Sequence, residues 1–429
     1  MLTSVEVILK IVGFISSPFS KLLTKWINKS FWNKFFYEFN QVNEKVEQYD
    51  LSHLENSKYL NDKVLKEYYK DAYTPITIKD TNKNIKTLLL PYQEIVNFIK
   101  VPQTTITISN PQAVKEFNLR EDIQEATGGI EKAFIKEGRA SHNDPHPRIA
   151  SFTQTGENKY SCIIEKATYY QQVRTNLSLD YAIKIAGRDW PTNMRTIDHQ
   201  NPSNLTDLDK SCLSNVVGVS AIWMMGDLGQ EKVFLLSRRK KVGVFESKLG
   251  IPSGNVEMPK DSRFASDSLI EFLSLDIARE FAEETGLCGK NIDRNKFPAP
   301  ALLNYSVKEW FKNLGPLLSE WFRKGRKFEW SEFYKNHPAA PLEIENMEII
   351  PLAFVRELMR GGKPQMFFLI RTPKVSLWKI RRSFRKSTGS KEFNSKFITS
   401  ATLSSETLCN YLYAQKWYQK NNDVDYIAL

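Results

Sequence analysis

The stretch "SDSLIEFLSLDIAREFAEETGL", Ser266–Leu287, combines an apolar helical pattern with a dense group of charges. Apolar side chains recur at intervals of three and four residues, which predicts a helix with a buried face. Glu280, Glu283 and Glu284 are spaced so that such a helix projects them together. We therefore expect three carboxylates on one helix face, with Arg279 one position round.

Three carboxylates within one helical turn repel one another unless a cation neutralises them. Carboxylate oxygen is the ligand type that suits Mg²⁺ and Mn²⁺, and a neighbouring arginine could fix the direction of one carboxylate. The alternative is an acidic helix face in contact with solvent. The wider spacing E-x7-R-E-φ-x-E-E-x-G-L, met from Glu271 to Leu287, favours the metal site. A chance match in a chain of this length is on the order of one in ten thousand or rarer.

This pattern resembles the signature of the Nudix hydrolase superfamily, G-x5-E-x7-R-E-U-x-E-E-x-G-U, in which U is a bulky apolar residue. Phe281 takes a position that is usually aliphatic. The first half differs, because the preceding glycine is best placed at Gly254 in "PSGNVE" and sixteen residues separate it from Glu271 in place of five. We expect the 11 extra residues to form a polar loop bulging from the loop–helix junction. Such a loop can leave both ends in place, since lengthening a surface loop costs little free energy.

The resemblance covers roughly residues 212–375 and implies an α/β/α sandwich with a mixed sheet. It implies hydrolysis of a nucleoside diphosphate linked to another group, assisted by Mg²⁺ or Mn²⁺ ions that lower the pKa of the attacking water. The residues that it assigns to the metal are Glu280, Glu283, Glu284, Glu271 and Gly254, with Arg279 orienting Glu280. In such an enzyme a carboxylate positions the water or takes its proton.

Several other side chains are weaker candidates for substrate contacts. Arg238 and Arg239 end an expected strand beside the site and could bind phosphates, or could simply be solvated. Lys363 lies in the glycine-rich turn "RGGKP" and could touch substrate. A general base from outside the helix could be Glu343, Glu345, Glu348 or Glu357, each of which could equally be a surface residue. The segment "HNDPHP", 142–147, resembles a metal motif, but its prolines favour an irregular loop.

The remaining elements follow from periodicity and from turn residues. We expect strands in "NIKTLLL", "TTITI", "KYSCIIEKATYY", "NVVGVSAIWMM", "EKVFLLSRR", "MEIIPLAFVREL" and "PQMFFLIRT". A helix is expected from Asn110, which would cap it, with Pro111 in the first turn and an interruption at Gly128. Gly286 should end the carboxylate helix in a left-handed cap, and a final helix is expected in "SETLCNYLYAQKWYQK".

The 429 residues suggest an α/β protein of several domains. We expect a helical N-terminal segment (1–75), a mixed α/β region (76–205), a Nudix-like domain (212–375) and a basic C-terminal extension with a final helix (376–429). The four cysteines are far apart, which is typical of free thiols in a reducing compartment.

The net charge of +11 favours polyanionic partners such as nucleotides. Residues 1–36 predict two amphipathic helices, which would pack on the protein or form a homo-oligomer; the alternative is a peripheral membrane contact. Residues 374–391 interleave basic and aromatic side chains, which indicates a surface helix or, less favoured, a nucleic acid or membrane contact. We expect a cytoplasmic protein without a signal peptide or a spanning helix.

Three functions are therefore open from the sequence. The first is a Mg²⁺-dependent hydrolase of a nucleoside-diphosphate-linked substrate. The second is a nucleotide sensor that binds without cleavage and signals through the other regions. The third is an effector that associates with membranes or nucleic acid. The linked group is not predicted by the pattern, because specificity in such folds lies in loops and added domains.

Overall fold

The chain is described by a computed structural model, which covers Leu65 and residues 68–79, 85–136, 140, 142–187, 192–199, 204–226, 232–237, 249–298, 341–376 and 404–421. The expected helices of 1–36, the Arg238–Arg239 pair and nearly all of the basic stretch 374–391 lie outside these residues. Within them, no helix is both long enough and apolar enough to cross a bilayer.

The core of the molecule is a six-stranded mixed sheet in the order β11-β10-β18-β17-β3, with β14 also paired to β10. Its strands are β3 (Tyr92–Asn97), β10 (Gly218–Met225), β11 (Lys232–Phe234), β14 (Ser253–Asn255), β17 (Glu348–Glu357) and β18 (Lys363–Thr372). β10 and β18 are parallel, and the other pairs are antiparallel. The strands expected in "NVVGVSAIWMM" and "EKVFLLSRR" correspond to β10 and β11, which pair antiparallel. The glycine turn between β17 and β18 is confirmed, with positive φ at Gly361 and Gly362.

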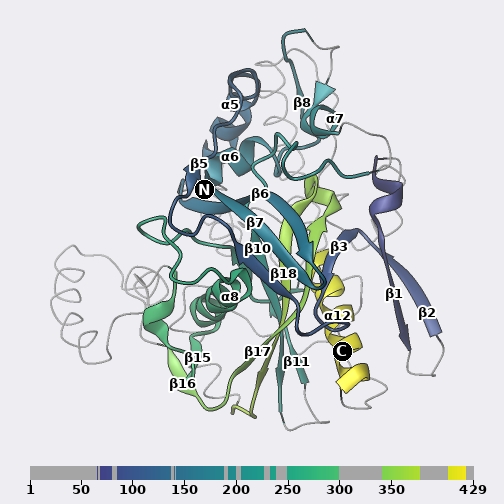
Figure 1. Cartoon of the computed structure of the whole chain (residues 1–429), viewed down its shortest axis with the longest axis vertical. Helices are drawn as coiled ribbons and strands as arrows, with labels where there is room; N and C mark the ends of the chain where they lie inside the picture. Colours follow the sequence, from purple (N-terminus) through teal and green to yellow (C-terminus); the bar gives the residue numbers. More distant parts are fainter. Residues whose placement is uncertain are drawn as a thin grey trace, which may run out of the picture.

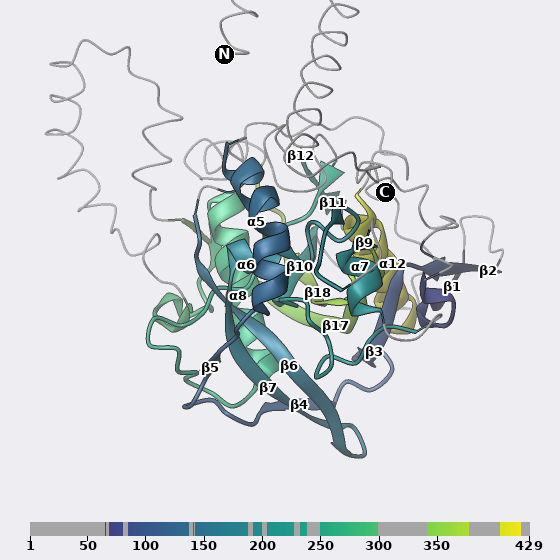
Figure 2. The same cartoon turned by 90° about the horizontal axis from the view of Figure 1, so that it is seen from above.

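The two faces of this sheet carry different helices because successive side chains of a strand point to opposite sides. Ala221 and Trp223 of β10 join the core formed with α8 (Leu269–Thr285), whereas Ile222 and Met224 pack with α12 (Ser405–Asn421). In Figure 2 the two helices lie on either side of the strands. The expected α/β class and the final helix are thereby confirmed.

A second, four-stranded sheet lies on the same side as α8. It consists of β4 (Thr105–Ile108), β5 (Lys115–Glu116), β6 (Pro145–Gly156) and β7 (Lys159–Thr168). Its buried Ile106 and Ile164 share one apolar core with α8. The helices α5 (Glu121–Lys136) and α6 (Tyr169–Arg174) follow β5 and β7, and Figure 1 shows them together at one end of the molecule.

The helix expected from Asn110 begins eleven residues later, at Glu121, and continues through Gly128 without interruption. The side chain of Asn110 does not cap a helix. Its Nδ2 donates to the Ile164 carbonyl at 2.7 Å, and its Oδ1 accepts from the Ile164 N–H at 2.9 Å. The asparagine thus takes the place of a strand neighbour beside β7, and the chain after it makes a turn at Pro111 and Gln112, closed by a hydrogen bond from the Ala113 N–H to the Asn110 carbonyl.

The main sheet takes strands from both sides of the boundary expected near 205–212. β3 lies far before it, yet pairs with β17 and covers what would otherwise be an open edge. Arg195 adds a second tie, because its buried guanidinium donates to Asp180 at 2.6 and 2.7 Å and to the carbonyls of Leu358 and Met359. The segments before and after the expected boundary are therefore packed into one another.

The smaller elements complete the described chain. They are β1 (Thr74–Lys79), β2 (Ile85–Leu90), β8 (Ala182–Ile183), β9 (Thr192–Asn193), α7 (Met194–Asp198), β12 (Leu236–Ser237), β13 (Leu249–Gly250), β15 (Leu287–Gly289), β16 (Leu342–Ile344) and the 3₁₀ turns Lys70–Ala72, Arg294–Lys296 and Leu358–Arg360. β2 is the strand expected in "NIKTLLL", and it pairs antiparallel with β1, which was not predicted. β15 runs parallel to β16 just after α8.

Candidate functional site

Both ends of α8 are fixed by local hydrogen bonds. The Ser268 side chain accepts from the Glu271 N–H at 3.3 Å, so it caps the first turn. Gly286 has φ 69°, and its N–H donates to the Ala282 carbonyl at 2.8 Å, as the predicted left-handed cap requires. These caps set the register in which the charged residues of α8 meet the main sheet.

Arg279 is the centre of the charge cluster. Its side chain is 1% exposed and lies against four carboxylates. The guanidinium donates to Glu280 at 2.7 Å, to Glu283 at 3.0 Å and to Asp276 at 3.0 Å. Glu257, just beyond β14, is 3.3 Å away. Among the described residues, this one guanidinium thus meets four acids.

Burial changes the proton affinity of these acids. It raises the pKa of Asp276 to about 7 and that of Glu283 to about 8, with Arg279 opposing and Glu280 reinforcing the shift. The pKa of Glu257 is also raised, chiefly by burial. An added cation would favour the ionised carboxylates and reverse these shifts.

Gly254 lies directly against the Glu280 carboxylate. A Cβ at this position would be 2.3 Å from Glu280 Oε1, so only glycine leaves the carboxylate its place. The strand around Gly254 is fixed by its pairing with Val219 of β10. The structure therefore brings Gly254 and Glu280 together even though the chain between them carries the extra residues.

Those extra residues do not bulge away as expected. Phe264 is 2% exposed and packs edge-on against Phe272, with ring centroids 4.7 Å apart. The Phe264 N–H donates to the Pro111 carbonyl at 2.9 Å, and the Ile108 N–H donates to the Asp267 carbonyl at 2.7 Å. The expectation of a protruding loop is wrong here, because a buried aromatic ring anchors the segment and ties the start of α8 to β4.

Other predicted residues lie elsewhere. Glu271 is exposed in the first turn of α8, and the nine-residue step to Glu280 corresponds to about 13 Å along the helix and half a turn round it. Lys363 and Glu357 are cross-strand neighbours and are almost fully buried. Lys363 Nζ donates to Gln365, which donates to Glu406 of α12, so this pair belongs to the α12 face of the sheet. These three residues are not gathered around Arg279.

The remaining base candidates lie in ion pairs close to the surface. Glu343 pairs with Arg294 at 2.9 Å, Glu348 pairs with Arg371 at 2.8 Å, and Glu345 pairs with Lys290. These pairs hold β16 and β17 to neighbouring segments.

Three residues near the cluster were not predicted. Asp276 precedes Arg279 by three residues and thus shares its helix face, a spacing that could have revealed it. Glu257 follows Gly254 by three residues, in the segment that enters the extra loop. His146 was assigned to an irregular loop, which is wrong from Pro145 onward, because β6 begins there.

His146 is buried beside this segment, with 7% of its surface exposed. Its Nδ1 is 2.7 Å from the Val256 carbonyl oxygen, one residue before Glu257. Burial lowers the pKa of His146 to about 4, and the charges of Lys363 and Arg279 contribute to the decrease. The imidazole is therefore neutral at neutral pH.

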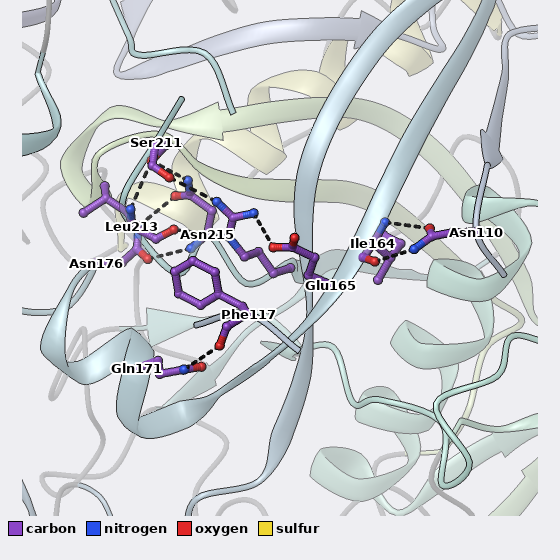
Figure 3. A network of polar contacts seen from close by, with 10 residues as sticks. Asn110, Phe117, Ile164, Glu165, Gln171, Asn176, Ser211, Leu213 and Asn215 are labelled. Carbon is purple, nitrogen blue, oxygen red and sulfur yellow. Dashed lines mark hydrogen bonds and ion pairs between the residues drawn. The ribbon is translucent and has the colours of Figure 1, made fainter. Parts of the chain in front are cut away.

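A polar network holds β6 against the chain that leads into β10 (Figure 3). Arg148 donates to Glu165 at 2.9 Å and to the carbonyls of Ser211 and Leu213, and it lies over the Phe117 ring. A separate set of bonds from Asn176 reaches Asn215 at 3.1 Å and the Arg360 carbonyl at 2.8 Å. These contacts position His146 relative to the main sheet.

No model of a known protein family matches the chain, and no curated protein matches it. In the part of the chain that the structure describes, no three Asp, Glu, His or Cys side chains form a ready-made cage for a metal ion. The donor set nevertheless fits Mg²⁺ or Mn²⁺ in kind, since the cluster offers carboxylate oxygens and Gly254 lets the Glu280 carboxylate come close to the β14 backbone.

Proposed function

We propose that this chain is a Mg²⁺-dependent hydrolase that cleaves the pyrophosphate of a nucleoside diphosphate linked to another group. The observation that carries the proposal is the convergence of Glu257, Glu280 and Glu283 on Arg279, directly beside Gly254. The resemblance to the Nudix signature supports it, because Gly254 and Glu280 belong to the two halves of that signature. A mixed sheet between α8 and α12 is also compatible with the sandwich that the resemblance implies.

The residues that would hold the cation are Glu280, Glu283 and Glu284. The bound ion would polarise phosphate oxygens and lower the pKa of a water molecule. Arg279 fixes the directions of Glu280 and Glu283 through its hydrogen bonds at 2.7 and 3.0 Å. The side chains of Glu280 and Glu283 are partly accessible, at 14% and 15% exposed, whereas Glu284 Oε2 is buried. A ligand can therefore reach the carboxylates of Glu280 and Glu283, while the arginine stays behind them.

A nucleotide sensor is the second candidate. Its support is that Arg279 already lies among the carboxylates and partly neutralises them, so the cluster does not depend on a metal ion for its charge balance. A sensor of this kind would bind a nucleotide without cleaving it.

Product analysis separates the two candidates. The full chain is incubated with nucleoside diphosphates linked to sugars, nucleosides or phosphates, first with Mg²⁺ and then with Mn²⁺, and the products are resolved by anion-exchange chromatography. A hydrolase releases a nucleoside monophosphate and the phosphorylated partner from at least one compound. Binding detected by calorimetry with no product from any compound would favour the sensor and contradict the hydrolase.

A further inference from the structure

We propose that His146 is a ligand-contacting residue of the same site, and that its Nε2 accepts a hydrogen bond from an O–H group bound beside Glu257. The O–H group is a water molecule or a ribose hydroxyl of the nucleotide. This inference rests on the proposed function for the identity of the ligand. It extends the site to β6, which lies outside the region that resembles the Nudix domain.

The first step is the position of the ring. The start of β6 runs along the segment that follows β14, since the Met258 N–H donates to the Pro145 carbonyl at 3.2 Å and His146 Nδ1 contacts the Val256 carbonyl. Glu257 lies between these two contacts, and its carboxylate is the one 3.3 Å from Arg279. The start of β6 therefore runs beside the backbone of Glu257, one member of the carboxylate cluster.

The second step is the state of the ring. A carbonyl oxygen can only accept, so the 2.7 Å contact with Val256 requires the proton on Nδ1. In a neutral imidazole this leaves Nε2 with a free lone pair. The same arrangement, one ring nitrogen donating to a carbonyl, is how proteins commonly fix a histidine tautomer for use by the other nitrogen.

The third step is the hydrogen bonding of Nε2. Among the described residues, the ring makes no hydrogen bond other than the one through Nδ1. The residue keeps 7% of its surface exposed, and Nε2 is the ring nitrogen that remains for a ligand. Tyr169 packs against the ring edge-on, with centroids 6.3 Å apart, and adds to its fixed orientation.

The fourth step is the chemistry of the ligand. A lone pair pairs with a donor and repels another lone pair, which excludes ionised phosphate oxygens as its partner. A hydrated nucleotide brings O–H donors in its water and ribose and N–H donors in its base, and the O–H groups are the ones close to its phosphates. His146 would then position this O–H group, while the carboxylates receive the cation.

Replacement of His146 by Asn removes the acceptor at Nε2 but can keep a hydrogen bond to the Val256 carbonyl. An asparagine amide can donate near the position of Nδ1 but has no acceptor at the position of Nε2. With the best substrate from the product analysis, we expect His146→Asn to lower kcat/KM about tenfold or more at an unchanged melting temperature. A loss in kcat alone indicates a water, and a rise in KM indicates a ribose hydroxyl. His142→Asn, four residues earlier and exposed, is the matched control and should be unchanged.

A spectroscopic measurement makes the test independent of turnover. In the ¹⁵N spectrum of histidine-labelled full chain at pH 7, His146 should show a protonated Nδ1 and an unprotonated Nε2. Methylene diphosphonate with Mg²⁺ should shift Nε2 if the donor is water. α,β-Methylene-ADP alone should shift it if the donor belongs to the nucleoside. His142 should not respond.

Full activity of His146→Asn, or an Nε2 signal that no probe shifts, would overturn the assignment. If the wild-type chain cleaves no nucleotide, the proposed function fails, and the spectrum still decides the role of His146.

Discussion

Arg279 and Gly254 act on the same carboxylate from two sides. The arginine donates to Glu280 at 2.7 Å, and the missing side chain at Gly254 leaves room for the carboxylate to pack against the glycine. Burying one cation among four acids costs desolvation free energy, which hydrogen bonds and mutual attraction offset only when the geometry is good. At the scale of residues, the site thus depends on the hydrogen bonds of Arg279 and on the absence of a side chain at Gly254.

Gly254→Ala tests whether the missing side chain at this position matters. The added Cβ would displace the end of the Glu280 side chain, which is flexible, so we expect a small change in the melting temperature. We expect Mg²⁺-dependent activity to fall at least about tenfold, because a carboxylate displaced from the cation no longer stabilises it.

Gly128→Ala in α5 is the control, since a Cβ there meets nothing within 4 Å. It should stabilise the protein by up to about 1 kcal/mol and leave activity unchanged. Full activity of Gly254→Ala would contradict the account.

At the scale of elements, α8 couples the cluster to the rest of the fold. Its apolar side packs on the main sheet, its first turn is tied to β4 by the extra residues, and its polar side carries the acids. The helix is therefore held in place even where its carboxylates repel one another.

The acids of α8 should make the stability of the metal-free protein fall with rising pH. The pKa values of Asp276 and Glu283, about 7 and 8, lie above the ordinary carboxyl value near 4. The folded state therefore keeps protons that the unfolded chain has lost, and this contribution to stability disappears as pH rises through 7 and 8. Urea unfolding in chelator from pH 5.5 to 8.5 should show the decrease, and Mg²⁺ should reduce it. Asp276→Asn should show a smaller decrease, the part that belongs to Glu283. A flat profile for the wild type would contradict the account.

The extra segment should contribute to stability as a packed element. Phe264→Ala removes a buried ring that contacts Phe272, so we expect the free energy of unfolding to fall by about 3–5 kcal/mol. Arg263→Ala, next to it and exposed, should change it by less than about 0.5 kcal/mol. Denaturant titrations measure both. Equal, small effects would mean that the segment is a loop without a structural role.

At the scale of the whole molecule, the described regions share cores and strands. β3 completes the main sheet, Arg195 joins residues on both sides of the expected boundary, and the second sheet shares a core with α8. The proposed site likewise combines Glu257 and α8 with His146 of β6. The residues of the proposed site thus come from segments more than a hundred residues apart in the sequence.

A fragment that begins at residue 205 should fail to fold alone. It keeps the carboxylate helix but lacks β3 and the second sheet, so the edge of β17 and a large apolar surface would be exposed. Circular dichroism and limited proteolysis should show an unstable or aggregated fragment, in contrast to a fragment that begins at residue 65. A stable, cooperative fragment from 205 would contradict this interdependence.

The elements that the sequence predicted correctly depend on local signals. The 3.6-residue period and the Gly286 cap define α8, and apolar runs define β10, β17 and β18. The failures depend on distant partners. Asn110 resembles a helix cap until Ile164, 54 residues later, offers both its backbone groups. The prolines beside His146 favoured an irregular loop, and its contact with the Val256 carbonyl is too distant in sequence to predict. The place of Gly254 beside Glu280 likewise depends on the pairing of the folded sheet.

The most direct test of the central claim is the rate of Mg²⁺-dependent nucleotide hydrolysis by Glu284→Gln, compared with the wild type and with Glu271→Gln on the same helix. Our account predicts that Glu284→Gln loses about 10³-fold or more of the activity at an unchanged melting temperature, because it removes a carboxylate proposed to hold the cation. It predicts that Glu271→Gln, exposed in the first turn and about 20 Å away along the helix, stays within about threefold of the wild type. Retained hydrolysis in Glu284→Gln would contradict the claim that the carboxylates of α8 hold the catalytic metal ion.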